Sequence, residues 1–271
     1  MTLTEIREAL TTRGLRPLKQ LGQNFLHDQN LAQWLAEHAV AGLAEGACVV
    51  EIGPGLGALT ESLLKKKVRL IALEKDRGLC VFLREKFARE IEEGWLDLRE
   101  GDALTLLGEL GETPEVICGN LPYYISTPLL MECFKIAGVP ARLFFLMQRE
   151  VGQRLASGCG GKTYGSLSVL VQVGYHVSLV RRLPGSVFYP PPEVESIVVQ
   201  LTPLTAPLVR PEERSAFAGV VQRGFSQRRK KLSNLLPTTD ERRAEHLSPG
   251  EWVALWRSCG EHGEVETRQG L

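Results

Sequence analysis

The feature that most constrains the fold is a regular alternation of short apolar runs with longer amphipathic stretches. Five apolar runs occur, at residues 47–52, 68–74, 96–99, 115–118 and 143–146. Stretches of helical character separate them, at residues 58–66, 77–90, 104–110 and 127–136. Strands that alternate with helices form a parallel sheet covered by helices on both faces. The sequence therefore predicts an α/β fold with a mainly parallel sheet.

Two helices are predicted before this alternating region. Thr2 and Glu5 have the spacing of a capping box, and Gly14 is a typical helix stop, so a helix is expected over residues 2–13. A second helix is expected over residues 28–41.

The chain changes character after the alternating region. Residues 175–183 and 196–201 are predicted strands that form a hairpin-like edge, joined by a proline-rich loop at 184–192. Helices without strands are predicted further on, at residues 212–225, 227–235 and 249–258. We therefore expect two domains, residues 1–205 and a small all-helical domain at residues 206–271.

A glycine-rich turn follows the first strand of the alternating region, with the sequence Glu51-Ile-Gly-Pro-Gly-Leu-Gly57. Three glycines allow the backbone to approach a ligand at the carboxyl end of a sheet, where such folds bind ligands. Glu74 ends the next strand, where a carboxylate can accept both hydroxyls of a ribose. The turn also satisfies G-x-G-x-x-G/A, so a nicotinamide or flavin dinucleotide is an alternative ligand.

Two later motifs favour an adenosyl ligand over a dinucleotide. Asp102 follows the third strand, where it can accept a hydrogen bond from an adenine amine. The tetrapeptide Asn120-Leu-Pro-Tyr123 follows the fourth strand, and no dehydrogenase chemistry requires it.

Together these motifs resemble one family, and they occur in that family's order: Gly22-Gln-Asn-Phe-Leu26, Glu51 to Gly57, Glu74, Gly101-Asp102, Asn120 to Tyr123 and Phe188-Tyr-Pro-Pro-Pro192. Nearly the whole chain is similar to S-adenosylmethionine-dependent ribosomal RNA adenine-N6 dimethyltransferases. The run Gln227-Arg-Arg-Lys-Lys-Leu-Ser-Asn-Leu235 is similar to the family members that dimethylate two adjacent adenosines near the 3′ end of small-subunit (16S) rRNA, rather than to the erythromycin-resistance methylases of large-subunit rRNA. One departure is Tyr124, where Asn is usual.

The resemblance implies a fold, a cofactor and a partner. The fold would be a Rossmann-like class I methyltransferase sheet with a small helical domain behind it. The cofactor would be S-adenosyl-L-methionine, converted to S-adenosyl-L-homocysteine, with no metal. The partner would be 16S rRNA within an immature small ribosomal subunit, and the protein would act in subunit biogenesis as a monomer.

The resemblance also implies residue roles. Asn24 and the backbone of Leu26 would hold the methionine end of the cofactor, with Gly53 against it. The implied cofactor-binding set is Gln23, Asn24, Leu26, Glu51, Gly53, Gly55, Glu74, Lys75, Asp102, Ala103 and Asn120. The implied catalytic set is Asn120, Leu121, Pro122, Tyr123 and Phe188.

The chemistry of adenine N6 explains why an Asn and a rigid turn are needed. This amine is a poor nucleophile because its lone pair is delocalised into the ring. An amide oxygen on Asn120 and a main-chain carbonyl at Leu121 or Pro122 can accept its two N–H groups and direct the lone pair at the methyl group. The base must be flipped out and stacked, and Tyr123 and Phe188 are expected on its two faces, with Tyr189 as an alternative to Phe188.

The balance of charge does not exclude an RNA partner. Lys+Arg and Asp+Glu are equal at 32 each, but the charges are unevenly distributed along the chain. Residues 90–115 hold nine acidic residues against Arg99, whereas residues 135–182 hold seven basic ones against Glu150. A second basic segment, residues 223–231, holds five basic residues and no acidic one. Both basic segments are candidates for phosphate contacts, and the RNA-binding residues expected are Arg223, Arg228, Arg229, Lys230 and Lys231.

Other features favour a cytosolic, metal-free protein. No apolar run approaches the roughly 20 residues that span a bilayer, and the N-terminus has no signal-peptide pattern. The six cysteines form no C-x-x-C pair, and the five histidines have no ligand spacing, so neither zinc nor a disulfide framework is expected. Two other functions remain open. One is an assembly or binding factor that docks on an immature ribosomal subunit, with methylation secondary or lost, and the other is a DNA adenine-N6 methyltransferase, whose tetrapeptide is similar.

Overall fold

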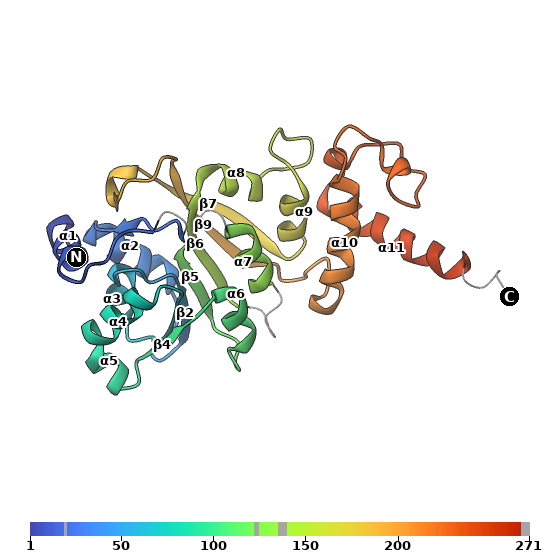
Figure 1. Ribbon diagram of the computed structural model, residues 1–271. Coiled ribbons are helices and arrows are strands. Elements are labelled where there is room, and N and C mark those ends of the chain that lie inside the picture. Colours follow the sequence, from blue (N-terminus) through green and yellow to red (C-terminus); the bar gives the residue numbers. More distant parts are fainter. Residues whose placement is uncertain (19–20, 122–124, 135–139, 267–271) are drawn as a thin grey trace. The chain divides into compact units, whose positions relative to one another are not determined.

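The structure is a computed structural model that describes residues 1–18, 21–121, 125–134 and 140–266, with side chains up to residue 259. The chain divides into two compact units (Figure 1). Unit 1 comprises Met1–Arg149 and Leu179–Leu201, and unit 2 comprises Glu150–Ser178 and Thr202–Leu271.

A seven-stranded sheet has the strand order β4-β3-β2-β5-β6-β9-β7. Strands β2 to β6 pair in parallel, and β9 pairs antiparallel to β6. The strands are β2 (Cys48–Ile52), β3 (Arg69–Glu74), β4 (Leu96–Glu100), β5 (Val116–Asn120), β6 (Arg142–Gln148), β7 (Tyr175–Leu183) and β9 (Ser196–Pro203). This confirms the predicted parallel sheet and the two strands added beside it.

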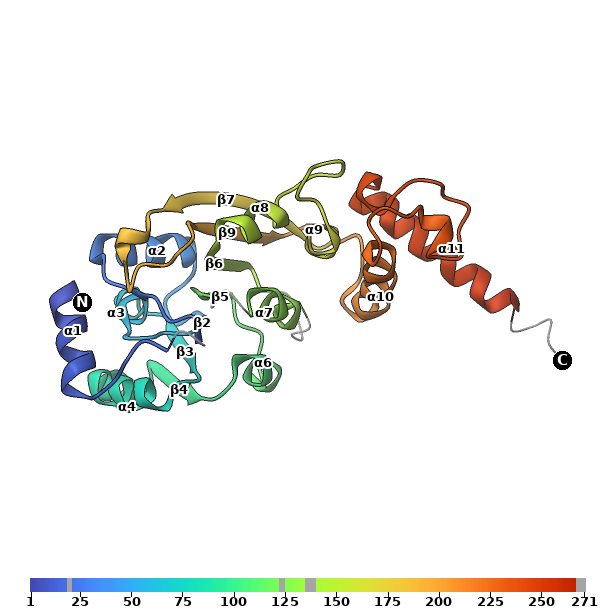
Figure 2. The same cartoon turned by 45° about the horizontal axis from the view of Figure 1, so that its top comes forward.

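Helices cover both faces of the sheet in unit 1. The helices are α1 (Leu3–Thr12), α2 (Gln29–Ala39), α3 (Ala58–Leu64), α4 (Arg77–Lys86), α5 (Ala88–Glu92), α6 (Ala103–Leu106), the 3-10 turn η2 (Leu107–Glu109) and α7 (Ser126–Cys133). Figure 2 shows α2, α3 and α4 on one face, and α6 and α7 on the other. The predicted capping box of α1 is present, and Asp28, Asp76 and Asp102 cap α2, α4 and α6. The alternation of sequence character therefore corresponds to real strand-helix units.

A small second sheet was not expected from the sequence. Strand β1 (Phe25–Leu26) pairs antiparallel with β8 (Phe188–Tyr189), which follows the 3-10 turn η3 (Gly185–Val187). Leu26 lies opposite Phe188. The proline-rich segment, which had been expected to form only a loop, is therefore tied to the Gln-Asn-Phe-Leu segment near the N-terminus.

Unit 2 is helical and has its own core. Its helices are α8 (Arg149–Leu155), α9 (Ser166–Gln172), α10 (Arg214–Phe225) and α11 (Pro249–Glu266), with 3-10 turns η4 (Pro211–Glu213), η5 (Leu232–Asn234) and η6 (Ala244–His246). Trp252 is fully buried and stacks on Phe225 at 5.4 Å between ring centroids. A Cβ on Gly224 would lie 2.4 Å from the Trp252 ring, so this glycine permits the close approach of α10 and α11.

The division into units differs from the predicted boundary at residue 206, because residues 150–178 group with the C-terminal helices. Tyr164, Val169 and Val173 are buried in the same apolar cluster as Phe217 and Trp252. The Tyr164 hydroxyl also donates a hydrogen bond to the Leu247 carbonyl at 2.8 Å. Helices α8 and α9 lie in a stretch to which the sequence analysis assigned no element.

The helix predicted over residues 227–235 is wrong. The segment turns, and only η5 lies within it. The backbone N–H groups of Leu232 and Ser233 donate to the carbonyls of Arg242 and Asp240, 2.9 and 3.0 Å away. These groups are therefore satisfied by a neighbouring segment instead of by the carbonyls of a helix.

Candidate active site

The topology selects the place where a ligand can bind. From β2 the chain first extends to β3 and β4, and then returns to β5 on the other side of β2. Open α/β sheets bind ligands at the carboxyl ends of the strands beside such a reversal. Glu51 and Ile52 end β2 here, and Asn120 ends β5. Two of the sequence motifs therefore meet at this point.

The glycine-rich turn has the backbone conformation that its sequence predicts. Gly53, Gly55 and Gly57 have φ values of +67°, +59° and +78°, in the left-handed region that favours glycine. A Cβ on Gly53 would point toward the Asn120 carbonyl oxygen, 3.8 Å away. A Cβ on Gly55 would lie 3.1 Å from the Phe25 ring. The missing side chains keep the space between β2 and β5 open for a ligand.

Glu74 is held at the end of β3 by backbone groups. It is 6% exposed, and its carboxylate accepts hydrogen bonds from the N–H groups of Gly55, Lys75 and Asp76 at 3.2, 2.8 and 2.9 Å. Burial raises the pKa of Glu74 to about 7, against the lowering effect of these hydrogen bonds. The carboxylate is therefore fixed in position and bordered by the pocket.

Glu51 is a second buried carboxyl group in the same pocket. It is 1% exposed, and the Thr60 hydroxyl donates to its Oε2 at 2.7 Å. Burial raises the pKa of Glu51 to about 7, and the nearby charge of Glu74 acts in the same direction. Thr60 was missed by sequence reasoning, although it lies on the first helix after the glycine turn, facing the strand that carries Glu51.

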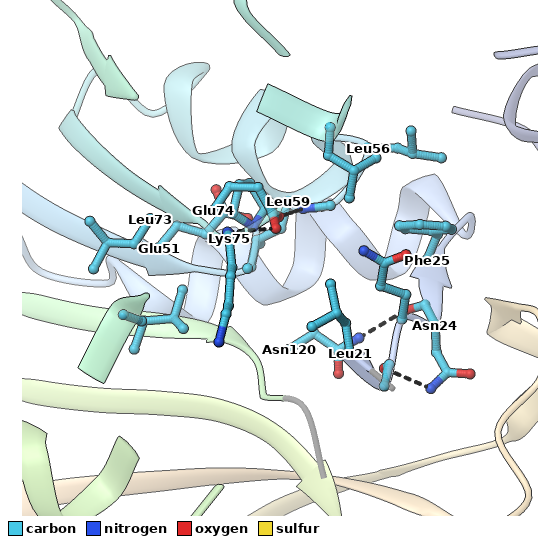
Figure 3. A pocket seen from close by; sticks show the side chains of 18 of the residues that line it. Leu21, Asn24, Phe25, Glu51, Leu56, Leu59, Leu73, Glu74, Lys75 and Asn120 are labelled. Atoms are coloured by element: carbon cyan, nitrogen blue, oxygen red, sulfur yellow. Dashed lines mark hydrogen bonds between the residues drawn. The ribbon is translucent and has the colours of Figure 1, made fainter. Parts of the chain in front are cut away.

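The Asn120 side chain has a defined orientation. Its Nδ2 donates to the main-chain carbonyl of Asn24 at 3.0 Å, and the Asn24 Nδ2 donates to the Gly22 carbonyl at 3.1 Å (Figure 3). Because the amide nitrogen is used in this way, Oδ1 remains to accept a hydrogen bond from a ligand. The described part of the chain contains no hydrogen bond to this oxygen. The structure thus links the first motif, Gly22 to Leu26, with the Asn120 to Tyr123 motif through the backbone of Asn24.

Gln23 ties the first motif to the helix that follows Glu74. Its Nε2 donates to Asp76 Oδ2 at 2.9 Å, and its Oε1 accepts from the Leu18 N–H at 2.8 Å. Asp76 also caps α4. Sequence reasoning missed Asp76, although an Asp immediately before a helix is a recognisable N-cap signal.

Asp102 and Lys75 form the far side of the pocket. Lys75 Nζ contacts Asp102 Oδ2 at 2.7 Å, and the Leu104 N–H donates to Asp102 Oδ1 at 3.0 Å. The pKa of Asp102 is lowered first by Lys75 and then by this backbone hydrogen bond. Asp102 is therefore ionised at neutral pH.

All the residues expected to bind the cofactor line one pocket in unit 1, which is shown in Figure 3. These residues are Gln23, Asn24, Leu26, Glu51, Gly53, Gly55, Glu74, Lys75, Asp102, Ala103 and Asn120. The same pocket is lined by apolar side chains that the sequence analysis did not name, among them Phe25, Leu59, Leu79 and Ile125.

The residues expected to be catalytic are only partly brought together. Leu121 follows Asn120, is buried, and its N–H donates to the Leu146 carbonyl at 2.9 Å. Pro122, Tyr123 and Tyr124 lie outside the described residues. The Phe188 side chain is 3% exposed within the apolar core and does not line the pocket, so its stacking on a base stays a prediction. Tyr189, the alternative ring, is partly exposed and contacts Arg7 through a cation-π interaction at 5.3 Å.

The basic run in unit 2 is exposed but partly neutralised. Arg228 pairs with Glu245 at 3.2 Å, and Lys231 pairs with Glu241 at 2.5 Å. Within the described residues, Arg223, Arg229 and Lys230 are exposed and have no ion pair. These three cations are the ones best placed to meet phosphate groups.

The other charged segments are also balanced in space. In the acidic stretch, Glu112, Glu100 and Asp102 pair with Arg69, Arg84 and Lys75 from outside it.

In the basic stretch, Arg142 donates to the carbonyls of His38, Ala39 and Ala41 at 3.1, 2.7 and 3.2 Å. It stabilises the end of α2, as cations near helix C-termini do. A count along the sequence therefore overstated the free positive charge in this stretch.

The described residues form neither a metal site nor a membrane-spanning helix. Among them, no group of three or more His, Cys, Asp or Glu side chains is arranged to hold a metal ion. No helix in the described ranges has the length and apolar character to cross a membrane.

Comparison with known proteins identifies the family. A family model described as Ribosomal RNA adenine dimethylase matches residues 15–250, which is most of the chain. The chain belongs to the ribosomal RNA adenine dimethylase family. The match includes every residue assigned above to the pocket.

Relatives that carry one name are similar to most of the chain. A protein of Moorella thermoacetica named Ribosomal RNA small subunit methyltransferase A is 42% identical over 247 residues, covering 87% of this chain and 82% of the relative. A protein of the same name from Thiobacillus denitrificans is 39% identical and covers 92% of both chains.

Solved structures show the same fold. A dimethyladenosine transferase from Plasmodium falciparum has a TM-score of 0.72 at 21% identity, covering 88% of this chain and 98% of its own. The 23S rRNA methyltransferase ErmE has a TM-score of 0.65 at 22% identity, covering 88% and 100%. The predicted class I methyltransferase fold is thus confirmed.

Proposed function

We propose that this ribosomal RNA adenine dimethylase transfers methyl groups from S-adenosyl-L-methionine to N6 of two adjacent adenosines near the 3′ end of 16S rRNA. The product would be N6,N6-dimethyladenosine. The observation that carries the proposal is the fixed amide of Asn120, whose Nδ2 is bound to the Asn24 carbonyl in a pocket that contains a buried carboxylate. The names of the curated relatives support the small subunit as the source of the substrate.

The pocket fits the cofactor in two respects. An adenosyl group carries a ribose diol, and Glu74 is a buried acceptor at the end of β3, where a diol can be held. Gly53 lacks a side chain at the point where a Cβ would enter the space next to Asn120. Glu74 would hold the ribose, Asp102 the adenine amine, and Gly53 with the Asn24 and Leu26 segment the methionine end. The bound cofactor supplies an electrophilic methyl group on a sulfonium.

Asn120 and the main chain after it would orient the substrate amine. Asn120 Oδ1 would accept one N6–H group, and a carbonyl at Leu121 or Pro122 would accept the other. With both hydrogens held, the nitrogen lone pair points toward the methyl group. Because Asn120 is held by the Asn24 main chain, little reorganisation is needed in the transition state.

No strong base is needed among the residues of this pocket. The amine becomes acidic once it carries the transferred methyl group as a fourth substituent and with it a positive charge, so solvent can take the proton. In the second round N6 retains one hydrogen, so one of the two acceptors suffices. Tyr123 and an aromatic ring from the Phe188-Tyr189 pair are proposed to stack on the flipped base.

Unit 2 is proposed to contact the rRNA of an immature small ribosomal subunit. The protein would then act in the cytoplasm as a subunit-biogenesis enzyme, and we propose that it is a monomer. Arg223, Arg229 and Lys230 support this because they are exposed cations without ion pairs among the described residues. Such contacts position RNA without reading its sequence.

Paired and unpaired cations of the same run provide a matched test. Replacing Arg229 and Lys230 with Gln removes two phosphate contacts. The negative slope of log affinity against log salt concentration should become shallower by about 1.4, because each contact to a single strand contributes about 0.7 to its steepness. Replacing Arg228 and Lys231, which are already paired with Glu245 and Glu241, changes the slope less. Equal effects of the two double variants would contradict this assignment.

Transfer of label tests the proposed activity. Labelled S-adenosyl-L-methionine is incubated with the protein and with small subunits from a strain that lacks the modification. We expect label in 16S rRNA. Binding of the subunits without transfer would indicate an assembly factor instead of an enzyme. Faster transfer to duplex DNA than to the subunits would indicate that DNA is the substrate.

A further inference from the structure

Unit 2 has a hollow of its own, between α10 and α11, with a volume of about 380 Å³. Gly219, Val220 and Arg223 of α10 line one wall. Their spacing of three and four residues places them on one face of the helix. Trp256 of α11 lines the opposite wall, and Leu236 and Pro237 also contribute. We call this hollow the unit 2 groove.

The groove is open at Gly219 and rigid at Trp256. A Cβ built on Gly219 meets no atom within 4 Å, so the space above this residue is free among the described atoms. The Trp256 ring is only partly buried, and Phe217 packs against it edge to face, with 5.6 Å between the ring centroids. An indole fixed from one side and open on another is a suitable surface for a planar ligand.

The charge at the groove favours an anion at one end. Arg223 is exposed and has no ion pair among the described residues, and no carboxylate lines the groove. Glu212 and Glu213, near the start of α10, are paired with Arg210 at 3.4 and 2.8 Å. The free charge of the groove is therefore positive.

We propose that the unit 2 groove binds one unpaired base of the RNA substrate, stacked on Trp256, with the adjoining phosphate on Arg223. Gly219 and Arg223 are one helical turn apart, about 6 Å at a rise of about 1.5 Å per residue, a span similar to that from a base to its phosphate. The groove combines a flat apolar surface and a cation, which are the two elements that bind single-stranded nucleic acid. This inference deepens the proposed function and rests on it.

Filling the groove tests the proposal without weakening the fold. In Gly219→Leu the new side chain occupies open space, and Leu has a higher helix propensity than Gly. The matched control is Gln222→Leu, which adds the same side chain at an exposed position of the same helix outside the groove. The affinity of each protein is measured for a labelled, unstructured hexaribonucleotide and for the same oligonucleotide with all bases removed.

We expect the full-length wild-type protein to bind the hexaribonucleotide about 5- to 150-fold more tightly than the abasic oligonucleotide, since stacking one base contributes about 1–3 kcal/mol. Gly219→Leu should lose most of this preference, whereas Gln222→Leu should retain it. Arg223→Gln should weaken binding of both oligonucleotides by a similar factor, because it removes a phosphate contact. The proposal is overturned if Gly219→Leu retains the preference for bases.

Two further measurements distinguish an RNA ligand from a protein ligand, and failure of this inference from failure of the proposed function. Stronger competition by an acidic peptide that contains Phe than by the oligonucleotide would show that the groove accepts a protein, which also overturns the proposal. The methylation assay on small subunits is run in parallel with the wild-type chain. If label is transferred but the base preference does not depend on Gly219, this inference fails and the proposed function remains. If no label is transferred at all, the proposed function itself fails.

Discussion

Replacing Glu74 by Gln should weaken cofactor binding in a way that depends on pH. The change keeps the size of a side chain that is 6% exposed and removes its charge. Hydrogen bonds to a charged group contribute about 1.5–3 kcal/mol and neutral ones about 0.5–1.5 kcal/mol, so two ribose hydroxyls lose about 2 kcal/mol between them. This corresponds to a dissociation constant about 30-fold higher at pH 8, where wild-type Glu74 is ionised.

The pH dependence distinguishes this role from simple packing. Burial raises the pKa of Glu74 to about 7, so the wild-type carboxyl group is mostly protonated at pH 6 and binding there should be about 10-fold weaker than at pH 8. The Gln variant has no such titration, so the two proteins should differ by only about threefold at pH 6. The quantity compared is the ratio of the dissociation constants of the two proteins at each pH. Titration of the cofactor itself affects both constants equally and cancels in this ratio.

Isothermal titration with S-adenosyl-L-methionine between pH 6 and 8 measures both effects. Glu85→Gln serves as the control, because Glu85 is exposed, pairs with Arg13 and does not line the pocket. A ratio that stays constant across this range, or a Gln variant with wild-type affinity at pH 8, would refute the assignment of Glu74 to the ribose.

Three further changes have defined expectations. Asn120→Ala should slow methyl transfer in single turnovers by about 100- to 1,000-fold, on the order of losing one positioned polar group, with a smaller change in cofactor affinity; wild-type turnover would rule out its role. Gly119→Ala should lower the free energy of unfolding by about 3 kcal/mol or more, because φ is +152° and the new Cβ would lie 2.2 Å from the Ile52 carbonyl oxygen. Thermal unfolding measures this effect. The control Gly108→Ala, whose Cβ would meet nothing within 4 Å, should be tolerated in the same assay. Glu51→Gln should stabilise the cofactor-free protein at pH 8 but not at pH 5, as measured by urea unfolding. The pKa of Glu51 is raised to about 7 in the folded state, so the wild-type free energy of unfolding falls by up to roughly 3 kcal/mol as pH rises from about 4.5 to 7. Equal effects of the substitution at both pH values would contradict this.

The parts of the fold that depend on local patterns were predictable. Buried parallel strands appear as continuous apolar runs, and the residues that end β2, β3 and β5 could be assigned to one edge of the sheet before any coordinates were known. For this reason Glu51, Glu74 and Asn120 line one pocket. The segment Gln23 to Leu26 lines the same pocket, but it was expected there only from the resemblance to a family. Their chemical roles were inferred mainly from the resemblance to a family.

Features that depend on distant partners were not predictable. Strand β8 forms because residues 188–189 pair with residues 25–26, more than 160 positions away, and neither pair has a strand pattern by itself. The segment 227–235 has helix-forming residues, but its backbone bonds to residues 240–243 instead. The neutralisation of Arg228 by Glu245 likewise depends on a turn that a count along the chain could not reveal.

Mass mapping of the methylated nucleosides tests the central claim most directly. Small subunits lacking the modification are incubated with the protein and S-adenosyl-L-methionine, and their 16S rRNA is digested and mapped. Our account predicts N6,N6-dimethyladenosine at two adjacent positions near the 3′ end, formed by the wild-type chain and lost in Asn120→Ala. Methylation at another position, on another atom, or at undiminished level in the Asn120→Ala variant would contradict it.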